Sequence, residues 1–508
     1  MKLKKRLSFF ALFSILSNPI LAQTEGNIIF GAPQVHEIYM TFSQTNYWDS
    51  LTLYMPLDQY LTGNIQIDGT VISNVGIKFK GNSSYNNPSD KKSFKISLNE
   101  YVAGQNVDGL KKFNLNNGFK DPSFLREKLA CDFYNEQGLG APRCAFTKVY
   151  INGSYWGLYT FIEEIDTKQF LNKHFGNKQG NMFKGDPSGD LKWINSTPSS
   201  YYTKYELHTN ETINDWSDLV SFINKINNTG TYFSDSLETI FNTGSFVKQW
   251  AAINIFANLD SYIGSGHNYY IYHDTLSNKF EWVAWDVNES FGNFNMGMTS
   301  TQLKNLSMFF VSIPSGSRPL MQKMLQNNNY KTEFINTICQ WLNYDFSNAA
   351  LDGKIDSLAN AIRIAVYADT KKFYSNQQFE DNLTTDITTT GPPPGGGTIL
   401  GLKSFITARR NSLITELALN NCFVAIDENH PFSNAVHVYP NPASNLVTIE
   451  FNGKEKENRI TIFNAFGQET KTIISTNKTA KINTSEFSEG FYILKINEDQ
   501  FLKLQILK

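Results

Sequence analysis

The chain has 508 residues, a formal net charge of −2 and a pI near 6.4. This length allows two or three domains with sizeable cores, and the lack of a basic excess argues against nucleic acid as a partner. Aromatic residues make up 14% of the chain and charged residues only 18%. This balance favours an exported, β-rich protein over a highly charged cytosolic one.

The N-terminus predicts a secretory signal peptide over residues 1–22. MKLKKR is its basic segment, and LSFFALFSILS is an apolar segment too short to span a bilayer, with cleavage expected after Ala22. No later apolar run reaches spanning length. We therefore expect an exported protein with no transmembrane segment in the mature chain.

Four cysteines allow three disulfide pairings, and the sequence does not choose among them. They are Cys131, Cys144, Cys339 and Cys422. None of their spacings is typical of a metal site. An exported protein permits disulfides, although Cys131 lies in a helix-like run and could equally be a buried thiol.

Alternating apolar and polar residues predict strands through residues 33–80 and again in SFKISL. The segment DPSFLREKLACDFYNEQGLG predicts a helix with Asp121 as its N-cap and Pro122 at the first helical position. FTKVYINGSYWGLYTFIEEI predicts a hairpin that turns at Asn152 and Gly153.

The second half of the chain is predicted to be mainly helical. One amphipathic helix is expected in WSDLVSFINKIN and a more apolar one in SFVKQWAAINIFANLD. A strand pair follows, from Asn268 to His273 and from Phe280 to Trp285, and residues 300–375 again favour helix. Residues 381–398 are Pro/Gly-rich and predict a flexible insertion.

The pattern of apolar and polar residues changes after a linker predicted at residues 423–435. Residues 436–508 contain short alternating segments separated by turn signals every 8–12 residues, which is the pattern of a small all-β sandwich domain.

Acidic and amide residues follow buried strands in the centre of the chain. Asp286 ends the apolar run FEWVAW, and a buried carboxylate is costly unless a cation accompanies it. The predicted strand pair could bring Asp260, Asn268 and Asp286 to one edge. Oxygen ligands of this kind suit a magnesium–nucleotide site.

Several motifs occur in the order found in one family of enzymes. Residues 34–420 resemble the CotH family of spore-coat-protein-H-like atypical protein kinases, through VGIKFKGNSS, KKSFKISL, DPSFLREKLA, NGSYWGLYTFIEEID, NLDSYIGSGHNYYIY and WVAWDVNESFG. The resemblance implies an α+β kinase-like domain over residues 34–422, with a β-rich N-lobe and a mainly helical C-lobe. It also implies ATP with Mg²⁺ or Mn²⁺ as cofactors.

The C-terminal segment matches a second family. VYPNPASNLVTIE, GFYILKI and the terminal lysine resemble the sorting domain of the type IX secretion (Por) system of Bacteroidetes. Residues 436–508 are thus expected to engage the type IX secretion machinery. This would deliver the protein across the outer membrane to the cell surface or the medium.

The kinase resemblance suggests how the nucleotide phosphates would be bound. The Gly-containing loop can bring backbone amides close to phosphate oxygens, and Lys92, ranked before Lys95, could bind phosphate from the next strand. Glu163 or Glu164 could pair with that lysine. Lys80 stands where an arginine is common in the family. The loop residues are Gly81, Asn82, Ser83 and Ser84.

Asp260 is the candidate base that orients the substrate hydroxyl, and His267 beside it is kept out of the catalytic set. Asn268, Asp286 and Asn288 are the candidate metal ligands. Asn288 stands where many family members have a second aspartate. This removes one negative charge from the expected metal site, although Glu289 could compensate.

Three functions remain open from the sequence. The first is a secreted or surface-exposed kinase that transfers the ATP γ-phosphate to Ser, Thr or Tyr of exported proteins. The alternative is a non-catalytic adhesin or coat-assembly protein on a degenerate kinase fold. A carbohydrate-active enzyme is a third, with its carboxylates among Glu163, Asp260 and Asp286.

Overall fold

The computed structural model describes residues 25–31, 33–312, 316–390, 396–420, 436–451, 457–464, 468–497 and 500–507. The predicted signal peptide and the predicted linker lie outside these residues. The chain forms two compact units, Met1–Val424 and Ala425–Lys508. The fold is mixed α/β, with a β-rich C-terminal region.

Seven strands near the N-terminus close into a barrel in the order β1-β2-β3-β4-β5-β7-β6. Neighbouring strands are antiparallel except at the seam, where β1 runs parallel to β6. Apolar side chains of these strands form one hydrophobic core. The strands are β1 (Val35–Thr41), β2 (Leu61–Ile67), β3 (Thr70–Lys80), β4 (Ser93–Ser97), β5 (Lys112–Asn116), β6 (Cys144–Ile151) and β7 (Ser154–Glu163).

Turn chemistry explains the β6–β7 hairpin, and the predicted turn is confirmed. Asn152 has φ 47° and Gly153 has φ 83°, the left-handed backbone that tight hairpins require and that Asn-Gly adopts at low cost. The Asn152 amide oxygen also accepts a hydrogen bond from the Phe42 backbone N–H at 2.8 Å. This bond ties the turn to the chain that follows β1.

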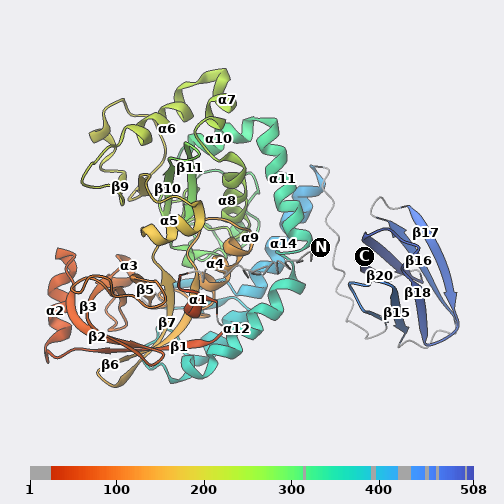
Figure 1. Ribbon diagram of the computed structural model, residues 1–508, viewed down its shortest axis with the longest axis horizontal. Helices are drawn as coiled ribbons and strands as arrows, with labels where there is room; N and C mark the ends of the chain where they lie inside the picture. The colour runs from red at the N-terminus through yellow and green to blue at the C-terminus, as the bar shows by residue number, and fades with distance from the viewer. Residues whose placement is uncertain are drawn as a thin grey trace, which may run out of the picture. The chain divides into compact units, whose positions relative to one another are not determined.

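The rest of the first unit is mainly helical around a small sheet of order β11-β10-β8-β9. Its strands are β8 (Met182–Gly185), β9 (Tyr205–Leu207), β10 (Tyr269–Asp274) and β11 (Lys279–Ala284). The predicted strand pair is confirmed, because β10 and β11 are antiparallel neighbours. In Figure 1 this green sheet lies apart from the red and orange barrel strands.

Helices surround both sheets of the first unit. Near the barrel are α1 (Asn27–Phe30), α2 (Tyr47–Tyr54), α3 (Ser83–Asn86) and α4 (Arg126–Glu136). Those that follow are α5 (Lys168–Phe175), α6 (Ser217–Asn228), α7 (Phe233–Glu238), α8 (Thr243–Ile255), α9 (Ser300–Lys304), α10 (Pro319–Gln326), α11 (Asn328–Asn343), α12 (Asn348–Ala368), α13 (Asn376–Thr384) and α14 (Leu402–Ala418). Among the described residues, none of these helices is long and apolar enough to cross a membrane.

The start predicted for α4 is wrong. Its N-cap residue is Leu125, not Asp121. The Asp121 carboxylate instead accepts hydrogen bonds from the backbone N–H groups of Ser123 at 3.0 Å and Arg126 at 2.9 Å. Arg126 is fully buried and pairs with Asp121, so it is not a surface residue.

The segment 381–398, predicted as a flexible insertion, includes ordered parts. It contains the end of α13 and a small antiparallel pair of strands, β12 (Ile387–Thr389) and β13 (Gly397–Ile399), while residues 391–395 lie outside the described residues. Of the four cysteines, Cys131 and Cys144 are free buried thiols and Cys339 is disulfide-bonded. Cys422 lies outside the described residues.

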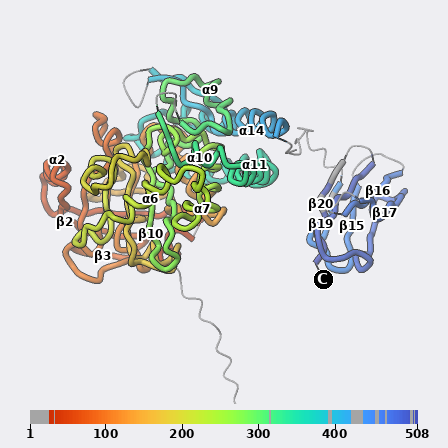
Figure 2. The backbone as a smooth tube through the Cα atoms, turned by 90° about the horizontal axis from the view of Figure 1, so that it is seen from above, coloured from red at the N-terminus to blue at the C-terminus, as the bar shows by residue number. Residues whose placement is uncertain are grey.

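The second unit consists of strands that form two antiparallel sheets, of order β14-β15-β18 and β17-β16-β19-β20 (Figure 2). Residues from both sheets share one hydrophobic core, which includes Ile449, Ile460 and Leu494. The strands are β14 (Val436–Tyr439), β15 (Leu446–Phe451), β16 (Asn458–Asn464), β17 (Glu469–Ser475), β18 (Thr479–Asn483), β19 (Gly490–Ile496) and β20 (Gln500–Ile506).

Candidate active site

A cavity of about 620 Å³ in the first unit is lined by residues from the barrel, from α4 and from the loops around β8, β10 and β11. Most of the sequence-predicted site residues line it. Its polar lining comprises Lys80, Gly81, Asn82, Ser83, Ser84, Ser93, Asn116, Asn117, Lys120, Asp121, Glu127, Thr160, Lys184, Asp186, Asp260, His267, Asn268, Asp286, Asn288 and Glu289.

The loop after β3 forms one wall of the cavity. All four residues of the predicted phosphate loop, 81–84, are in the lining. Gly81 has φ +95°, and a Cβ on it would lie 2.1 Å from the Ser84 hydroxyl oxygen. Only glycine fits this position without displacing Ser84, so the loop backbone can approach a ligand closely.

Lys80 ends β3 and places its ammonium in the cavity. It donates a hydrogen bond to the Asn116 amide oxygen at 3.2 Å and lies 5.4 Å from the centroid of the Trp285 ring. Burial lowers the pKa of Lys80, while the nearby carboxylates, Asp286 first, act to raise it. Lys80 is thus a cation enclosed among acids.

Glu127 lies on the first turn of α4, opposite Lys80. Its carboxylate accepts a hydrogen bond from the Asn116 amide nitrogen at 2.8 Å. Burial first, and then the charge of Asp286, raise the pKa of Glu127 to about 8, against the effect of Lys80. Neither Glu127 nor Asn116 was among the predicted site residues.

Asp260 lies in the loop after α8. The helix ends at Ile255, earlier than predicted, so Asp260 is beyond the helix terminus. One carboxylate oxygen lies 2.8 Å from His267 Nε2, and the other accepts from the Asn268 side-chain amide at 3.1 Å. His267 Nδ1 lies 3.3 Å from the Pro187 carbonyl. His267 therefore holds Asp260 in place.

Asp286 follows β11 in a left-handed conformation, φ 50°. Within the described residues its carboxylate makes no hydrogen bond or ion pair. Burial raises its pKa, and the positive charge of Lys80 opposes that shift. The Asn288 side-chain oxygen is also buried without a hydrogen-bond partner. Two side chains that line the cavity, two residues apart in sequence, thus have oxygens without a hydrogen-bond partner among the described residues.

The Glu289 carboxylate, unlike that of Asp286, already has partners in the protein. Its carboxylate pairs with the Lys120 ammonium at 3.1 Å and accepts from the Asn293 amide at 3.0 Å. Burial raises its pKa to about 7, and Lys120 opposes that shift. The Glu289 carboxylate, expected to compensate for the missing charge at Asn288, is therefore paired with Lys120 instead.

The residues present fit a divalent cation bound by mixed oxygen ligands. The described residues contain no group of three or more His, Cys, Asp or Glu side chains that could hold a metal. A cation here would therefore rely on Asp286 together with amide oxygens, those of Asn288 and Asn268. Hard cations accept such neutral oxygen ligands.

Two predicted residues lie outside the cavity lining and do not contact each other. The Lys92 ammonium donates to the backbone carbonyls of Tyr85 and Asn87, at 2.7 and 2.5 Å. Glu163 is buried between the side chains of Arg143 and Lys173, each at 2.7 Å.

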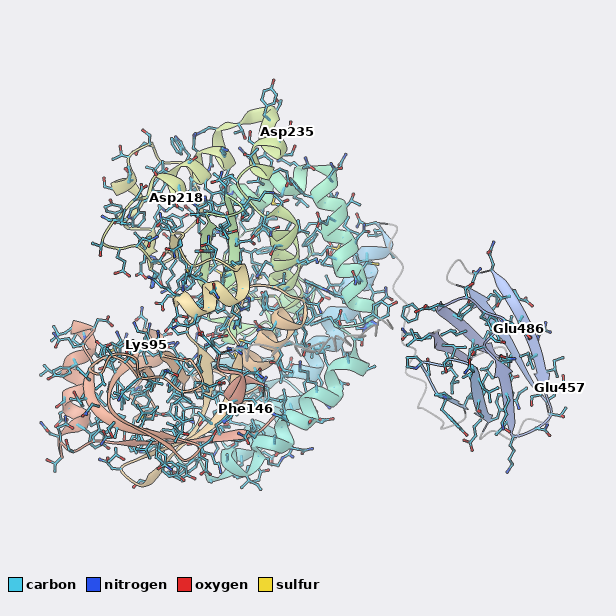
Figure 3. The ribbon with its side chains drawn as sticks, in the orientation of Figure 1. Lys95, Phe146, Asp218, Asp235, Glu457 and Glu486 are labelled. Atoms are coloured by element: carbon cyan, nitrogen blue, oxygen red, sulfur yellow. The ribbon has the colours of Figure 1, made fainter. Side chains whose placement is uncertain are left out.

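Lys95, labelled in Figure 3 on the barrel, pairs with Glu164 at 2.8 Å and is also outside the lining. The residues that sequence reasoning missed are Glu127, Asn116 and Lys120, together with the position of Lys80 in the cavity. A signal for two of them was present. Lys80 immediately precedes the Gly81 loop, and Glu127 lies in the motif DPSFLREKLA.

The barrel, the helical region and the acid-lined cavity define a mixed α/β protein with a candidate phosphotransfer site. The chain belongs to the CotH kinase protein family, whose model matches residues 77–387. Residues 437–506 match the model of the secretion system C-terminal sorting domain. That domain implies secretion to the cell surface.

Three curated relatives are similar to this chain over more than half of its length. Inner spore coat protein H of Bacillus subtilis is 24% identical over 296 residues, which are 57% of this chain and 77% of that protein. Invasin CotH2 of Rhizopus delemar is 22% identical over 356 residues, 66% of this chain and 59% of the invasin. Invasin CotH3 of the same organism is 22% identical over 347 residues, 64% and 57% of the two chains.

One solved structure is similar over most of its length, the proinflammatory kinase CtkA of Helicobacter pylori. The two are 12% identical, and the match covers 72% of this chain and 93% of that one with a TM-score of 0.30. A TM-score this low supports no conclusion about fold or function.

Proposed function

We propose that the protein is an exported atypical protein kinase that transfers the ATP γ-phosphate to Ser, Thr or Tyr hydroxyls of exported proteins. The barrel would be its N-lobe, and the helical region around β8–β11 its C-lobe. The observation that carries the proposal is the pair of unsatisfied oxygens on Asp286 and Asn288, beside the Lys80 ammonium. Phosphoryl transfer requires a cation, a phosphate-binding lysine and an oriented nucleophile.

The proposal gives each residue of the site a definite role. Lys80 binds nucleotide phosphate, a role expected for Lys92, and Glu127 replaces Glu163 as the acid associated with that lysine. The loop Gly81–Ser84 presents backbone amides to the phosphates. Asp286, with Asn268 and Asn288, would hold Mg²⁺ or Mn²⁺, which when bound neutralises phosphate charge.

Asp260 accepts the proton of the substrate hydroxyl. His267 and Asn268 fix its two carboxylate oxygens, at 2.8 and 3.1 Å. This leaves the orientation of the carboxylate determined before substrate arrives, which lowers the entropic cost of reaching a reactive geometry.

The route of export completes the proposal. A signal peptide over residues 1–22 would direct the chain across the inner membrane, and residues 436–508 would engage the type IX secretion machinery of a Bacteroidetes cell. The substrates would then be exported or surface proteins.

A second candidate is a surface-binding protein without catalysis. Two relatives are named invasins, and Asn288 removes a negative charge that a metal site would use. In that case the cavity would be a remnant of a kinase site.

Phosphate incorporation separates the two. The purified full-length protein is incubated with ATP and Mg²⁺ or Mn²⁺ alongside D286A and D260A, and labelled sites are mapped by mass spectrometry. We expect labelling that both substitutions abolish, and a nucleotide-dependent thermal shift that D286A loses and D260A keeps. Absence of both labelling and shift would exclude the kinase, and a shift without labelling would favour the binding protein.

A further inference from the structure

We infer that Asn116 is a positioning residue that holds the Lys80 ammonium toward the nucleotide phosphates by linking it to Glu127. The inference rests on the proposed kinase function. Its basis is one side chain with two hydrogen bonds. The Asn116 amide oxygen accepts from Lys80 Nζ at 3.2 Å, and its nitrogen donates to Glu127 Oε1 at 2.8 Å.

Lys80 and Glu127 are not joined directly. Their side chains form no ion pair within 4.0 Å in the described part of the chain, although each affects the other's pKa. Asn116 therefore bridges the two side chains, and no carboxylate of the described residues contacts the lysine. Its ammonium keeps donors available for a ligand in the cavity.

The barrel determines where Asn116 lies. It is the last residue of β5, and its backbone pairs with Thr160 on β7, which also lines the cavity. The three linked side chains come from β3, β5 and α4. Their relative position is thus set by the sheet and by the packing of α4.

The Asn116 amide provides a donor and an acceptor without changing the local charge. Carboxylate oxygens cannot donate to Glu127, and apolar side chains can neither donate nor accept. An aspartate would also add a third acid beside Glu127 and Asp286, whose charges already disfavour each other. Asparagine therefore suits this position, and aspartate or an apolar residue does not.

The chain offers a matched control. Asn114 lies two residues earlier on β5, is fully buried, and donates to Glu164 at 3.1 Å, outside the cavity. Residues two apart on a strand share a face, so N114A removes the same type of side chain from the same face of β5. Asn114 is the more deeply buried of the two, so N114A should lose at least as much stability as N116A, and only N116A should affect nucleotide binding.

The test measures the Kd for ATP with Mg²⁺ by calorimetry, together with the Tm, on the full-length protein. We expect N116A to weaken ATP binding about tenfold or more, as a lost hydrogen bond to a charged group would, while N114A stays within about twofold of wild type. Equal affinities for wild type and N116A would overturn the inference alone. Wild-type protein that binds no ATP would overturn the proposed function as well.

A charge exchange distinguishes positioning from packing. N116D loses the amide donor to Glu127 and adds a second carboxyl group, whereas the double variant N116D/E127Q restores a donor–acceptor pair with one carboxyl group. We expect N116D to bind ATP about tenfold more weakly than wild type, and the double variant to recover most of that loss. A double variant as weak as N116D would refute the bridge.

Discussion

Asn288 is the residue whose substitution should strengthen the cation site. Its side-chain oxygen is buried without a hydrogen-bond partner, two residues after Asp286, whose carboxylate makes no ion pair with the described residues. A second carboxylate there would attract a divalent cation more strongly than a neutral amide does. We expect N288D to lower the Mg²⁺ concentration for half-maximal phosphorylation by about tenfold, the equivalent of 1.4 kcal/mol.

The matched substitution is D186N, which removes charge from a cavity residue that pairs with Lys184. It should leave the Mg²⁺ requirement within about twofold, well under the tenfold that 1.4 kcal/mol represents. If N288D has no effect on the Mg²⁺ requirement, Asn288 is not a ligand.

Glu127 should make stability depend on pH. Its pKa in the folded protein is about 8, above its ordinary value, so the folded state keeps a proton that the unfolded state has released. Stability is therefore lost as pH rises from about 4.5 to 8, by up to about 1.4 kcal/mol per pH unit for one group. E127Q has no proton to release, and its profile should be flatter in urea unfolding at pH 5–8.

The comparison variant is E136Q, on the same helix but with a side chain that is 60% exposed. Its profile should follow that of wild type. Parallel profiles for E127Q and wild type would mean that Glu127 is ionised throughout this range in the folded protein.

At the scale of single residues, the sequence predicted the acids and amides of the site better than its lysine. Asn268 precedes β10, and Asp286 and Asn288 follow β11, so the predicted pairing of these two strands brings them to one edge, close to Asp260. Which of several lysines enters a cavity depends on tertiary packing. β3 and β5 are held side by side with β4 between them, and α4 contacts β5 through the Asn116–Glu127 hydrogen bond, an arrangement that no local pattern contains.

At the scale of elements, a buried ion pair joins α12 to the barrel. Lys91, just before β4, and Asp369, just after α12, are both 0% exposed. Asp369 also accepts from the backbone N–H of Leu158 at 3.0 Å and of Lys371 at 2.9 Å. D369A would leave the Lys91 ammonium buried and unpaired, and we expect it to lower the free energy of unfolding by about 3–5 kcal/mol.

Urea unfolding checks this expectation, with D90A as the control. Asp90 is 67% exposed and lies 3.7 Å from Lys371, so its loss should cost under about 1 kcal/mol. Costs of the same size for D369A and D90A would show that the buried pair contributes little.

Local chemistry explains which elements could be predicted. The β6–β7 hairpin follows from an Asn-Gly turn between alternating strands, and the β10–β11 pair follows from apolar runs around a polar turn. The first residue of α4 could not be predicted from local sequence. Asp121 caps the segment through its side chain, as expected of an N-cap residue, but residues 121–125 fold into a turn stabilised by the buried Arg126.

At the scale of the whole molecule, the two compact units predict separable properties. A chain ending at residue 435 retains all of the first unit and every residue that lines the cavity. We expect it to bind ATP with unchanged affinity and to accumulate in the periplasm of a host with a type IX secretion system. Cell fractionation and calorimetry check the two expectations, and surface delivery of the truncated chain would contradict the sorting role.

The seam between β1 and β6 has a consequence for the timing of folding. The first strand, Val35–Thr41, reaches its final neighbour only when Cys144–Ile151 is available. A chain emerging from the ribosome at about 5–20 residues per second therefore spends several seconds without a closed barrel. During that interval β1 can pair with β2 but not with β6, so this topology delays completion of the barrel until β6 has been synthesised.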